Sequence, residues 1–159
     1  MERLAQALTF LAALGSGLMA GLFFIFSITI MASLAKLTPA NGIAAMQSIN
    51  VTILGGTFLS VFMGTALICL VLIVAWFLGW MPSGGLYVVA ASIAYLVGII
   101  GVTMVFNVPL NDALMTIQPE SAEAAASWQQ YLSSWMPWNH VRTLAGIASL
   151  ALFILGFRG

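Results

Sequence analysis

The chain has 159 residues, of which 62% are hydrophobic and only 5% are charged. A soluble domain carries roughly 25% charged residues, so this chain has too few to cover a surface that faces water. Its formal net charge is zero, which removes the basic patch that a nucleic-acid-binding protein needs. We therefore expect an integral membrane protein with the lipid bilayer as its surroundings and no nucleic-acid partner.

Four segments of the chain are long and apolar enough to cross a membrane. A membrane helix needs about 20 mostly apolar residues, and helices are favoured because lipid cannot hydrogen-bond to exposed backbone amides. We predict an all-α fold, a four-helix transmembrane bundle that forms a single domain over residues 1–159. The expected spans are approximately 4–34, 51–80, 86–106 and 141–157.

The longest connection, between the third and fourth spans, has a helical pattern of its own. Glu120 lies at a helix start, and the aromatic residues Trp128 and Tyr131 recur on one helical face. Trp and Tyr are common at the membrane–water interface. We expect an additional amphipathic helix over residues 120–135, lying at the interface or capping the bundle, with Pro137 ending it.

An even number of spans places both termini on the same side of the membrane. Positive residues favour the cytoplasmic side, but Arg3 and Arg158 on the terminal side balance Lys36 and Arg142 on the other. Since Arg142 can belong to a site rather than to a loop, we expect cytoplasmic termini. The expected location is a bacterial inner membrane.

The first span carries small residues four positions apart, at Gly17 and Gly21. Small residues at this spacing let two helices approach closely. The spacing is consistent either with packing inside the bundle or with a homo-oligomer that uses the Gly17/Gly21 face.

Polar side chains gather towards the membrane face that lies away from the termini. The first and second spans are joined on that side, and so are the third and fourth. Polar residues at the start of the second and fourth spans and at the end of the third span therefore meet at one face. The residues in question are Asn50, Asn107, Asn111, Asp112, Asn139, His140 and Arg142.

The segment 107–112 carries two asparagines around a proline. Asn107 and Asn111 are four apart and share a face if the segment is helical. Pro109 has no backbone N–H and leaves the carbonyl of Val105 without its helical donor. Such carbonyls are tolerated at membrane depth where they line a cavity or are satisfied by neighbours. The segment is therefore either a cavity wall or a capped helix end.

The segment 135–143 brings an indole, an amide and a guanidinium onto one helical turn, because Trp138 and Asn139 precede Arg142 by four and three positions. An arginine in the hydrocarbon costs about 2.5 to 3.5 kcal/mol on insertion scales unless it is paired or hydrated. Asp112 is the candidate partner. The alternatives are a structural Arg142–Asp112 ion pair, a clamp for an anion, or a side chain that reaches to the interface.

His140 is the only histidine of the chain, and it projects to a different side from its neighbours on a helix. A single histidine cannot supply the ligands of a typical zinc site, so no metal site is expected. One axial haem ligand remains open. An imidazole can also act as a general base near neutral pH, or simply form interfacial hydrogen bonds.

At these motifs the sequence resembles the anthrone oxygenase-like membrane proteins. The resemblance covers most of the chain and rests on the small-residue first span, on residues 45–50, and above all on residues 107–112 and 135–143. It implies a small four-helix membrane protein. Some fungal members of this family oxidise an anthrone to an anthraquinone with molecular oxygen, so the resemblance implies an oxygenase for an apolar aromatic molecule.

The expected site can be stated on this basis. Deprotonation of an anthrone gives an electron-rich anion that can react with oxygen without a metal or flavin, so no cofactor is favoured. The protein would supply a base, donors to the oxyanion and an apolar slot. We expect His140 and Arg142 to be catalytic. The expected substrate-binding residues are Asn50, Asn107, Asn111, Asp112, Trp135, Trp138 and Asn139.

Two other functions fit the same sequence. The bundle can hold a haem or a quinone, with His140 as an axial ligand and Met46 or Met104 as a sulfur ligand. The chain can also be non-enzymatic, binding a lipid or apolar small molecule or serving as a subunit that helps a larger complex assemble.

Overall fold

A computed structural model describes residues 2–81 and 83–158 of the chain. In these residues every regular element is helical, and four helical segments are long and apolar enough to span a membrane. This confirms the predicted all-α four-helix membrane bundle. The spanning segments are Glu2–Leu34, Gly56–Phe77, Gly85–Met115 and Ala124–Arg158.

Two of the four spans are interrupted by π-helical turns, in which each N–H bonds to the carbonyl five residues earlier. The first span consists of α1 (Glu2–Ile25), the π segment η1 (Phe26–Ile30) and α2 (Met31–Leu34). The third span is built in the same way, over more segments. It comprises α5 (Gly85–Tyr95), the π segments η2 (Leu96–Gly101) and η3 (Thr103–Asn107), and α6 (Val108–Met115).

The second span begins later than predicted. Residues 51–80 were expected to form one span, but α3 (Pro39–Thr52) is a separate helix and α4 (Gly56–Phe77) forms the span. Thr38 caps α3, with its hydroxyl accepting a hydrogen bond from the backbone N–H of Asn41 at 3.4 Å. The additional helix of this fold therefore lies between the first and second spans.

The prediction of a separate interfacial helix over 120–135 that Pro137 ends is wrong, because α7 (Ala124–Arg158) runs through Pro137 without a break. The fourth span is thus far longer than the predicted 141–157. A proline inside a helix removes one backbone hydrogen bond and bends the helix. The helix continues because both halves of α7 are held by neighbours, α3 and α6 on one half and α1 and α5 on the other.

Pro109 likewise does not end the third span, which was predicted over 86–106 and continues to Met115. The proline lies in the first turn of α6, directly after η3, where its missing N–H is tolerated. As a consequence, Asn107 lies inside a spanning segment rather than at its end. Arg142 likewise lies near the middle of α7.

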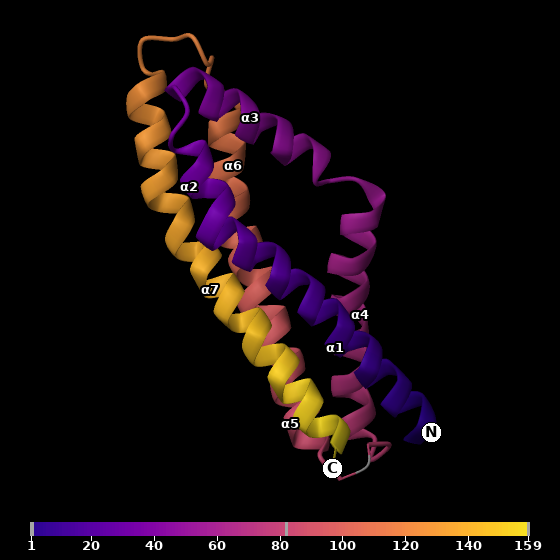
Figure 1. The fold of residues 1–159 in the computed structure, drawn as a ribbon. Helices are drawn as coiled ribbons and strands as arrows, with labels where there is room; N and C mark the ends of the chain where they lie inside the picture. The colour runs from indigo at the N-terminus through magenta and orange to yellow at the C-terminus, as the bar shows by residue number, and fades with distance from the viewer. Residues whose placement is uncertain (1, 82, 159) are drawn as a thin grey trace.

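The N- and C-termini lie at the same end of the bundle (Figure 1). We call this the terminal half and the opposite end, with α3, α6 and the first part of α7, the distal half. Close packing of α1 on α7 depends on Gly146, where a Cβ would come within 2.9 Å of the Cβ of Ala20. A Cβ at Gly17 would meet Leu150 at 3.6 Å, whereas one at Gly21 would meet nothing within 4 Å. The Gly17/Gly21 homo-oligomer stays a prediction.

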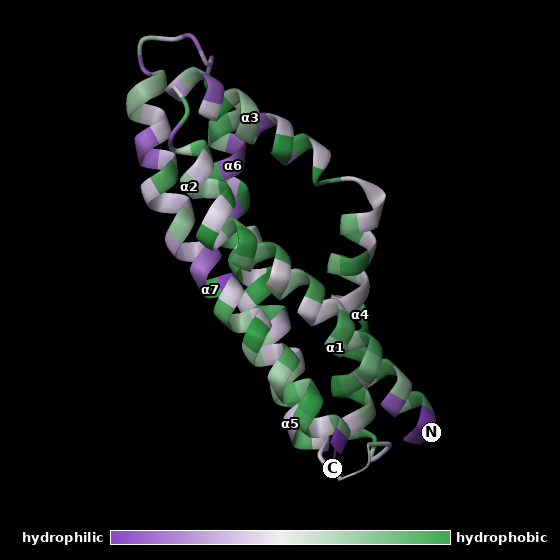
Figure 2. Cartoon of the chain, in the orientation of Figure 1, coloured by the Kyte–Doolittle hydropathy of each residue, from purple (hydrophilic) through white to green (hydrophobic). Residues whose placement is uncertain are grey.

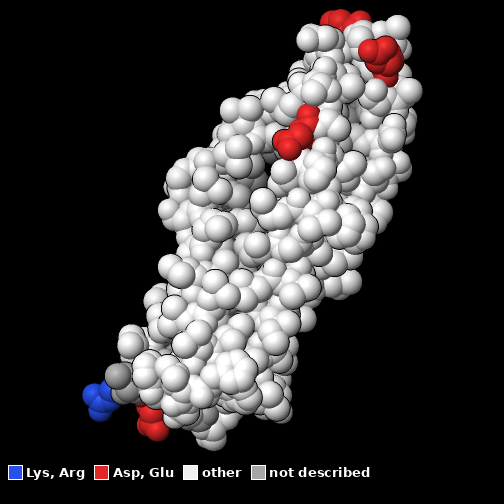
Figure 3. All heavy atoms as spheres, turned by 180° about the vertical axis from the view of Figure 1, so that it is seen from behind, with Lys and Arg blue, Asp and Glu red and all other residues white. Residues whose placement is uncertain are grey.

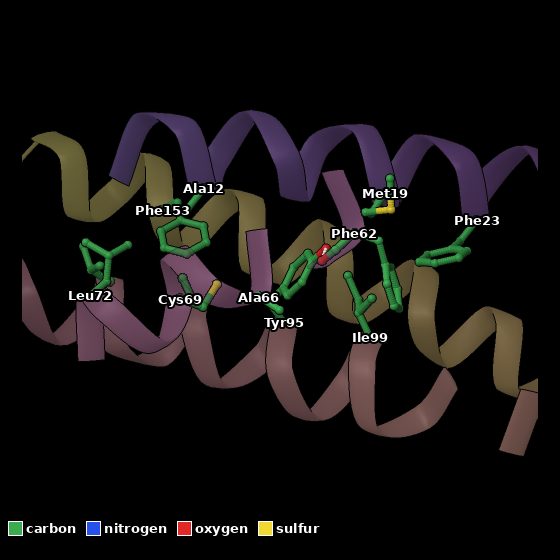
Figure 4. Close-up of a cluster of buried hydrophobic side chains, with 12 residues drawn as sticks. Ala12, Met19, Phe23, Phe62, Ala66, Cys69, Leu72, Tyr95, Ile99 and Phe153 are labelled. Carbon is green, nitrogen blue, oxygen red and sulfur yellow. Dashed lines mark hydrogen bonds between the residues drawn. The ribbon is translucent and has the colours of Figure 1, made fainter. Parts of the chain in front are cut away.

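Two hydrophobic cores correspond to these two halves. The terminal core contains Ala12, Met19, Phe23, Phe62, Ala66, Cys69, Leu72, Val88, Ala91, Tyr95, Ile99 and Phe153 (Figure 4). The distal core contains Phe26, Met31, Ile43, Met46, Leu114, Ala124, Trp128, Tyr131 and Trp135.

Polar residues are distributed unevenly over the molecule. Hydrophilic residues gather around α3, α6 and the first part of α7, and again at the N-terminus (Figure 2). Seen from behind, the middle of the surface is free of charge, with acidic groups towards the distal end and charges of both signs at the terminal end (Figure 3). An uncharged middle is what a lipid-embedded surface requires.

Candidate functional site

A cavity of about 300 Å³ lies in the distal half, between the first span, α3, the start of α4, the third span and α7. This volume is at the lower end of the range of about 300 to 1,000 Å³ typical of small-molecule sites. Its wall is mostly apolar and includes the aromatic rings of Phe23, Phe26 and Trp135. The polar side chains that line it are Asn50, Thr103, Asn111, Asp112 and Arg142.

Arg142 is the cation of this cavity, and its side chain is only 5% exposed. The guanidinium carbon lies 4.3 Å from the ring centroid of Phe23 and 5.0 Å from that of Trp135. A guanidinium over aromatic faces is stabilised by the ring quadrupoles. The aromatic wall therefore holds the charge in place beside the cavity.

The hydrogen-bond partners of Arg142 are all neutral. Nη2 donates to Oδ1 of Asn139 at 2.8 Å, Nη1 donates to the hydroxyl of Thr103 at 3.3 Å, and Nε has no partner. Within the part of the chain that the structure describes, no ion pair joins Arg142 to Asp112, so the structural bridge considered from the sequence is not formed. A buried charge without a counter-charge is costly. The guanidinium is therefore available to stabilise a negative charge that develops inside the cavity.

Asn139 is fully buried and fixes Arg142 from behind. Its Nδ2 donates to the carbonyl of Phe23 at 2.9 Å and to the hydroxyl of Ser27 at 2.8 Å. The carbonyl of Phe23 lies in the last turn of α1, three residues before η1 begins. The amide of Asn139 therefore ties α7 to the first span close to η1, while its oxygen orients the guanidinium.

His140 lies on the outside of the bundle, is exposed, and does not line the cavity. Its Nδ1 is 3.0 Å from the hydroxyl of Ser27, which also accepts the amide of Asn139. His140, which was expected to be catalytic, is thus connected to Arg142 only through the side chains of Ser27 and Asn139. It is not in direct contact with the cavity.

Asn111 lines the cavity and is held in one orientation by two aromatic residues. The hydroxyl of Tyr131 and Nε1 of Trp135 both donate to its Oδ1 at 2.9 Å. An indole N–H can only donate, so the shared atom must be the amide oxygen. This leaves the NH₂ group of Asn111 free to donate to a ligand.

The other two expected asparagines differ in position. Asn50 lines the cavity, and its buried Nδ2 has no partner. Asn107 is fully buried behind the wall, where Nδ2 donates to the carbonyl of Trp135 at 3.4 Å and Oδ1 has no partner. Asn50 therefore carries a donor without a partner at the cavity wall, whereas Asn107 supports the helix that carries Trp135.

Trp138 is not part of the cavity wall. Its ring stacks on that of Phe106, with centroids 3.5 Å apart and planes 6° apart. Asp112, in contrast, lines the cavity with an exposed side chain and is the carboxylate among the lining residues. The structure thus brings together Asn50, Asn111, Asp112, Trp135 and Arg142, with Asn107 and Asn139 directly behind them.

Several residues of the site were not expected from the sequence. Phe23, Ser27 and Thr103 contact Arg142 or Asn139 from the first and third spans, and each lies in or near a π segment. Tyr131 was expected to be an interfacial anchor but is buried and orients Asn111. A hydroxyl side chain inside an apolar span is the sequence signal that could have pointed to Ser27 and Thr103.

Among the described residues, no group of three or more His, Cys, Asp or Glu side chains could hold a metal ion. A family model described as anthrone oxygenase matches residues 58–152 of the chain. The matched region contains Asn111, Asp112, Asn139 and Arg142. No curated protein and no solved structure matches the chain.

Proposed function

The chain belongs to the anthrone oxygenase family, and on this premise we propose that it is a membrane-embedded oxygenase that oxidises an anthrone-type aromatic ketone with molecular oxygen. One observation carries the proposal. A buried guanidinium with no acidic side chain in ion-pair contact stands at the wall of a mostly apolar cavity that contains aromatic rings. Such a site suits a flat apolar molecule that becomes an oxyanion during the reaction.

The chemistry of the substrate explains why a cation is needed. An anthrone has an acidic methylene group opposite its carbonyl, because loss of a proton makes the central ring aromatic. The negative charge then resides largely on the former carbonyl oxygen. Arg142 and Asn50 line the cavity and carry buried donors without partners, Nε and Nδ2, so these two side chains would bind this oxygen. Donors that await a charge in a water-poor site stabilise the transition state strongly.

The proton acceptor in this proposal is Asp112. It is the carboxylate that lines the cavity, whereas His140 lies outside the wall. The proposal therefore reassigns the role of base from His140, as expected from the sequence, to Asp112.

The oxidation step uses oxygen dissolved in the membrane as the oxidant. The anion transfers an electron to O₂, and the resulting radical and superoxide combine to form a carbon–oxygen bond at the former methylene carbon. The peroxide then loses water, taking the remaining hydrogen of that carbon. One anthrone and one O₂ thus give one anthraquinone and one water, and Asp112 returns its proton in the elimination.

Oxygen uptake by the purified protein in lipid vesicles tests the proposal. With anthrone we expect one O₂ consumed for each anthraquinone formed, at a rate well above that of vesicles without protein. Binding of anthrone without oxygen uptake would overturn the proposal and favour a non-enzymatic role. An absorption spectrum of the same preparation checks the haem alternative, since a bound haem produces a Soret band. We also propose a bacterial inner membrane location with cytoplasmic termini, which protease protection of the tagged ends would test.

A further inference from the structure

A second hollow of about 510 Å³ lies next to the cavity, between α1 and the start of α4. We call it the access groove. It shares three wall residues with the cavity, Leu22, Ile53 and Phe58. The two spaces are therefore neighbours separated by these side chains. The ring of Phe58 lies at this boundary, stacked on Phe62 with centroids 5.2 Å apart.

The mouth of the access groove is at membrane depth. Leu18 and Leu22 line it and lie near the middle of the first span, Glu2–Leu34. Leu18 is 61% exposed, and the only polar side chains on the groove wall are the hydroxyls of Thr52 and Thr57. An exposed apolar wall in the middle of a membrane span faces lipid chains rather than water. The groove thus opens to the hydrocarbon.

The groove exists because the chain lies away from the surface of α1 where α3 ends and α4 begins. α3 runs away from α1 before the chain turns into α4 (Figure 1). The break covers residues 53–55, and Gly55 precedes the first residue of α4, Gly56. A Cβ placed on Gly56 would meet nothing within 4 Å, so a larger residue would be accommodated there. The absence of a side chain at Gly56 keeps the groove open.

We propose that the substrate reaches the cavity sideways from the bilayer, through the access groove and past Phe58. The substrate class is then a neutral apolar molecule dissolved in the membrane, because a charged one would not cross the hydrocarbon to this mouth. The molecule becomes an anion only inside, beside Arg142. This inference rests on the proposed function for the reaction, but the route itself concerns binding alone.

The test uses Gly56→Phe, which fills the groove, and Gly64→Phe as its matched control. Gly64 lies on the same helix, is outside the groove and also has open space around it. Binding of anthraquinone to each variant in lipid vesicles is followed by quenching of tryptophan emission, to which Trp135 at the cavity wall contributes. Thr57→Phe fills the same groove from a neighbouring position and repeats the measurement if Gly56→Phe does not fold.

We expect Gly56→Phe to slow association and dissociation of anthraquinone together, by about tenfold or more, with Kd unchanged, since a blocked path changes both rates but not the bound state. Gly64→Phe should match the wild type. Unchanged rates in Gly56→Phe, an equal slowing in Gly64→Phe, or no binding to the wild type would each overturn the inference. If the wild type binds anthraquinone and Gly56→Phe slows both rates, but the wild type takes up no oxygen with anthrone, only the proposed function is overturned and the route stands.

Discussion

The terminal and distal halves treat buried polar groups in opposite ways. In the terminal half they are paired within the protein. The hydroxyl of Tyr95 donates to the carbonyl of Phe62 at 3.0 Å (Figure 4), and those of Thr9 and Ser92 donate to carbonyls one turn earlier at 2.8 Å. In the distal half, buried atoms among the described residues lack partners. They are Nδ2 of Asn50, Oδ1 of Asn107, the hydroxyl of Ser121, Nε1 of Trp128 and Nε of Arg142.

This difference indicates that the two halves serve different purposes, stability in the terminal half and ligand binding in the distal half. A buried polar group without a partner costs roughly 1 to 3 kcal/mol, so natural proteins keep few of them. Two of the unpartnered atoms, on Asn50 and Arg142, belong to residues that line the cavity. We infer that the terminal half holds the bundle together and that the distal half gives up some stability to bind a ligand. Substitutions in the two halves should therefore have opposite effects.

The largest effect is expected from Asp112→Asn. Loss of the base should lower kcat for anthrone oxidation by about 10³-fold, within the usual range for removing a general base, and leave KM nearly unchanged. Because Asp112 is exposed, the fold should persist. Asp112→Glu, which keeps a carboxylate, should retain much of the activity. Oxygen uptake measures both, and an Asp112→Asn variant with wild-type kcat would show that another group takes the proton.

Arg142→Met should lower kcat by about 10²- to 10³-fold, the usual effect of removing a donor to an oxyanion. Its free energy of unfolding should change by less than about 1 kcal/mol, because the lost hydrogen bond to Asn139 is offset by removal of an uncompensated buried charge. Arg142→Lys keeps the charge and should fall between Arg142→Met and the wild type. Thermal unfolding and oxygen uptake give the two readouts, and a large loss of stability in Arg142→Met would contradict the division between the halves.

Leu72→Ala in the terminal core should have the reverse effect. Leu72 is fully buried there. We expect a loss of about 2 kcal/mol in the free energy of unfolding, since the cavity left behind is costly even where lipid replaces water as the surroundings. The activity of the protein that remains folded should be unchanged. Denaturant unfolding in detergent, combined with oxygen uptake per folded molecule, tests this, and reduced activity at full folding would link the two halves.

The smallest effect is expected from His140→Ala. His140 is exposed and forms a hydrogen bond with Ser27, so substitution should change both activity and stability by less than about 0.5 kcal/mol, or roughly twofold in rate. Asn139→Leu, one position away and fully buried, serves as the contrasting variant and should lower activity clearly. A loss in His140→Ala as large as that of Asp112→Asn would restore the histidine as the base.

Much of the architecture was determined by the sequence alone. Hydropathy is summed over some 20 residues, so single exceptions do not hide a span, and the number of spans then places both termini at one end. The same topology placed Asn50, Asn111, Asp112 and Arg142 in one half of the bundle. These predictions succeeded because they depend on composition and chain order rather than on the direction of any one side chain.

Only the tertiary structure decided which of these side chains share the cavity. Each π turn adds a residue to the helix and rotates every later side chain by about 100°, and no pattern in the local sequence predicts it. In the third span this rotation occurs in η2, ahead of Thr103, and so affects whether the hydroxyl of Thr103 faces Arg142, whereas in the first span η1 follows Phe23. Continuity of α7 through Pro137 depended in turn on packing by its neighbours. The polar half could therefore be predicted, and helical spacing already placed His140 on a different side from its neighbours, but only the structure showed that Asp112 and not His140 lines the cavity.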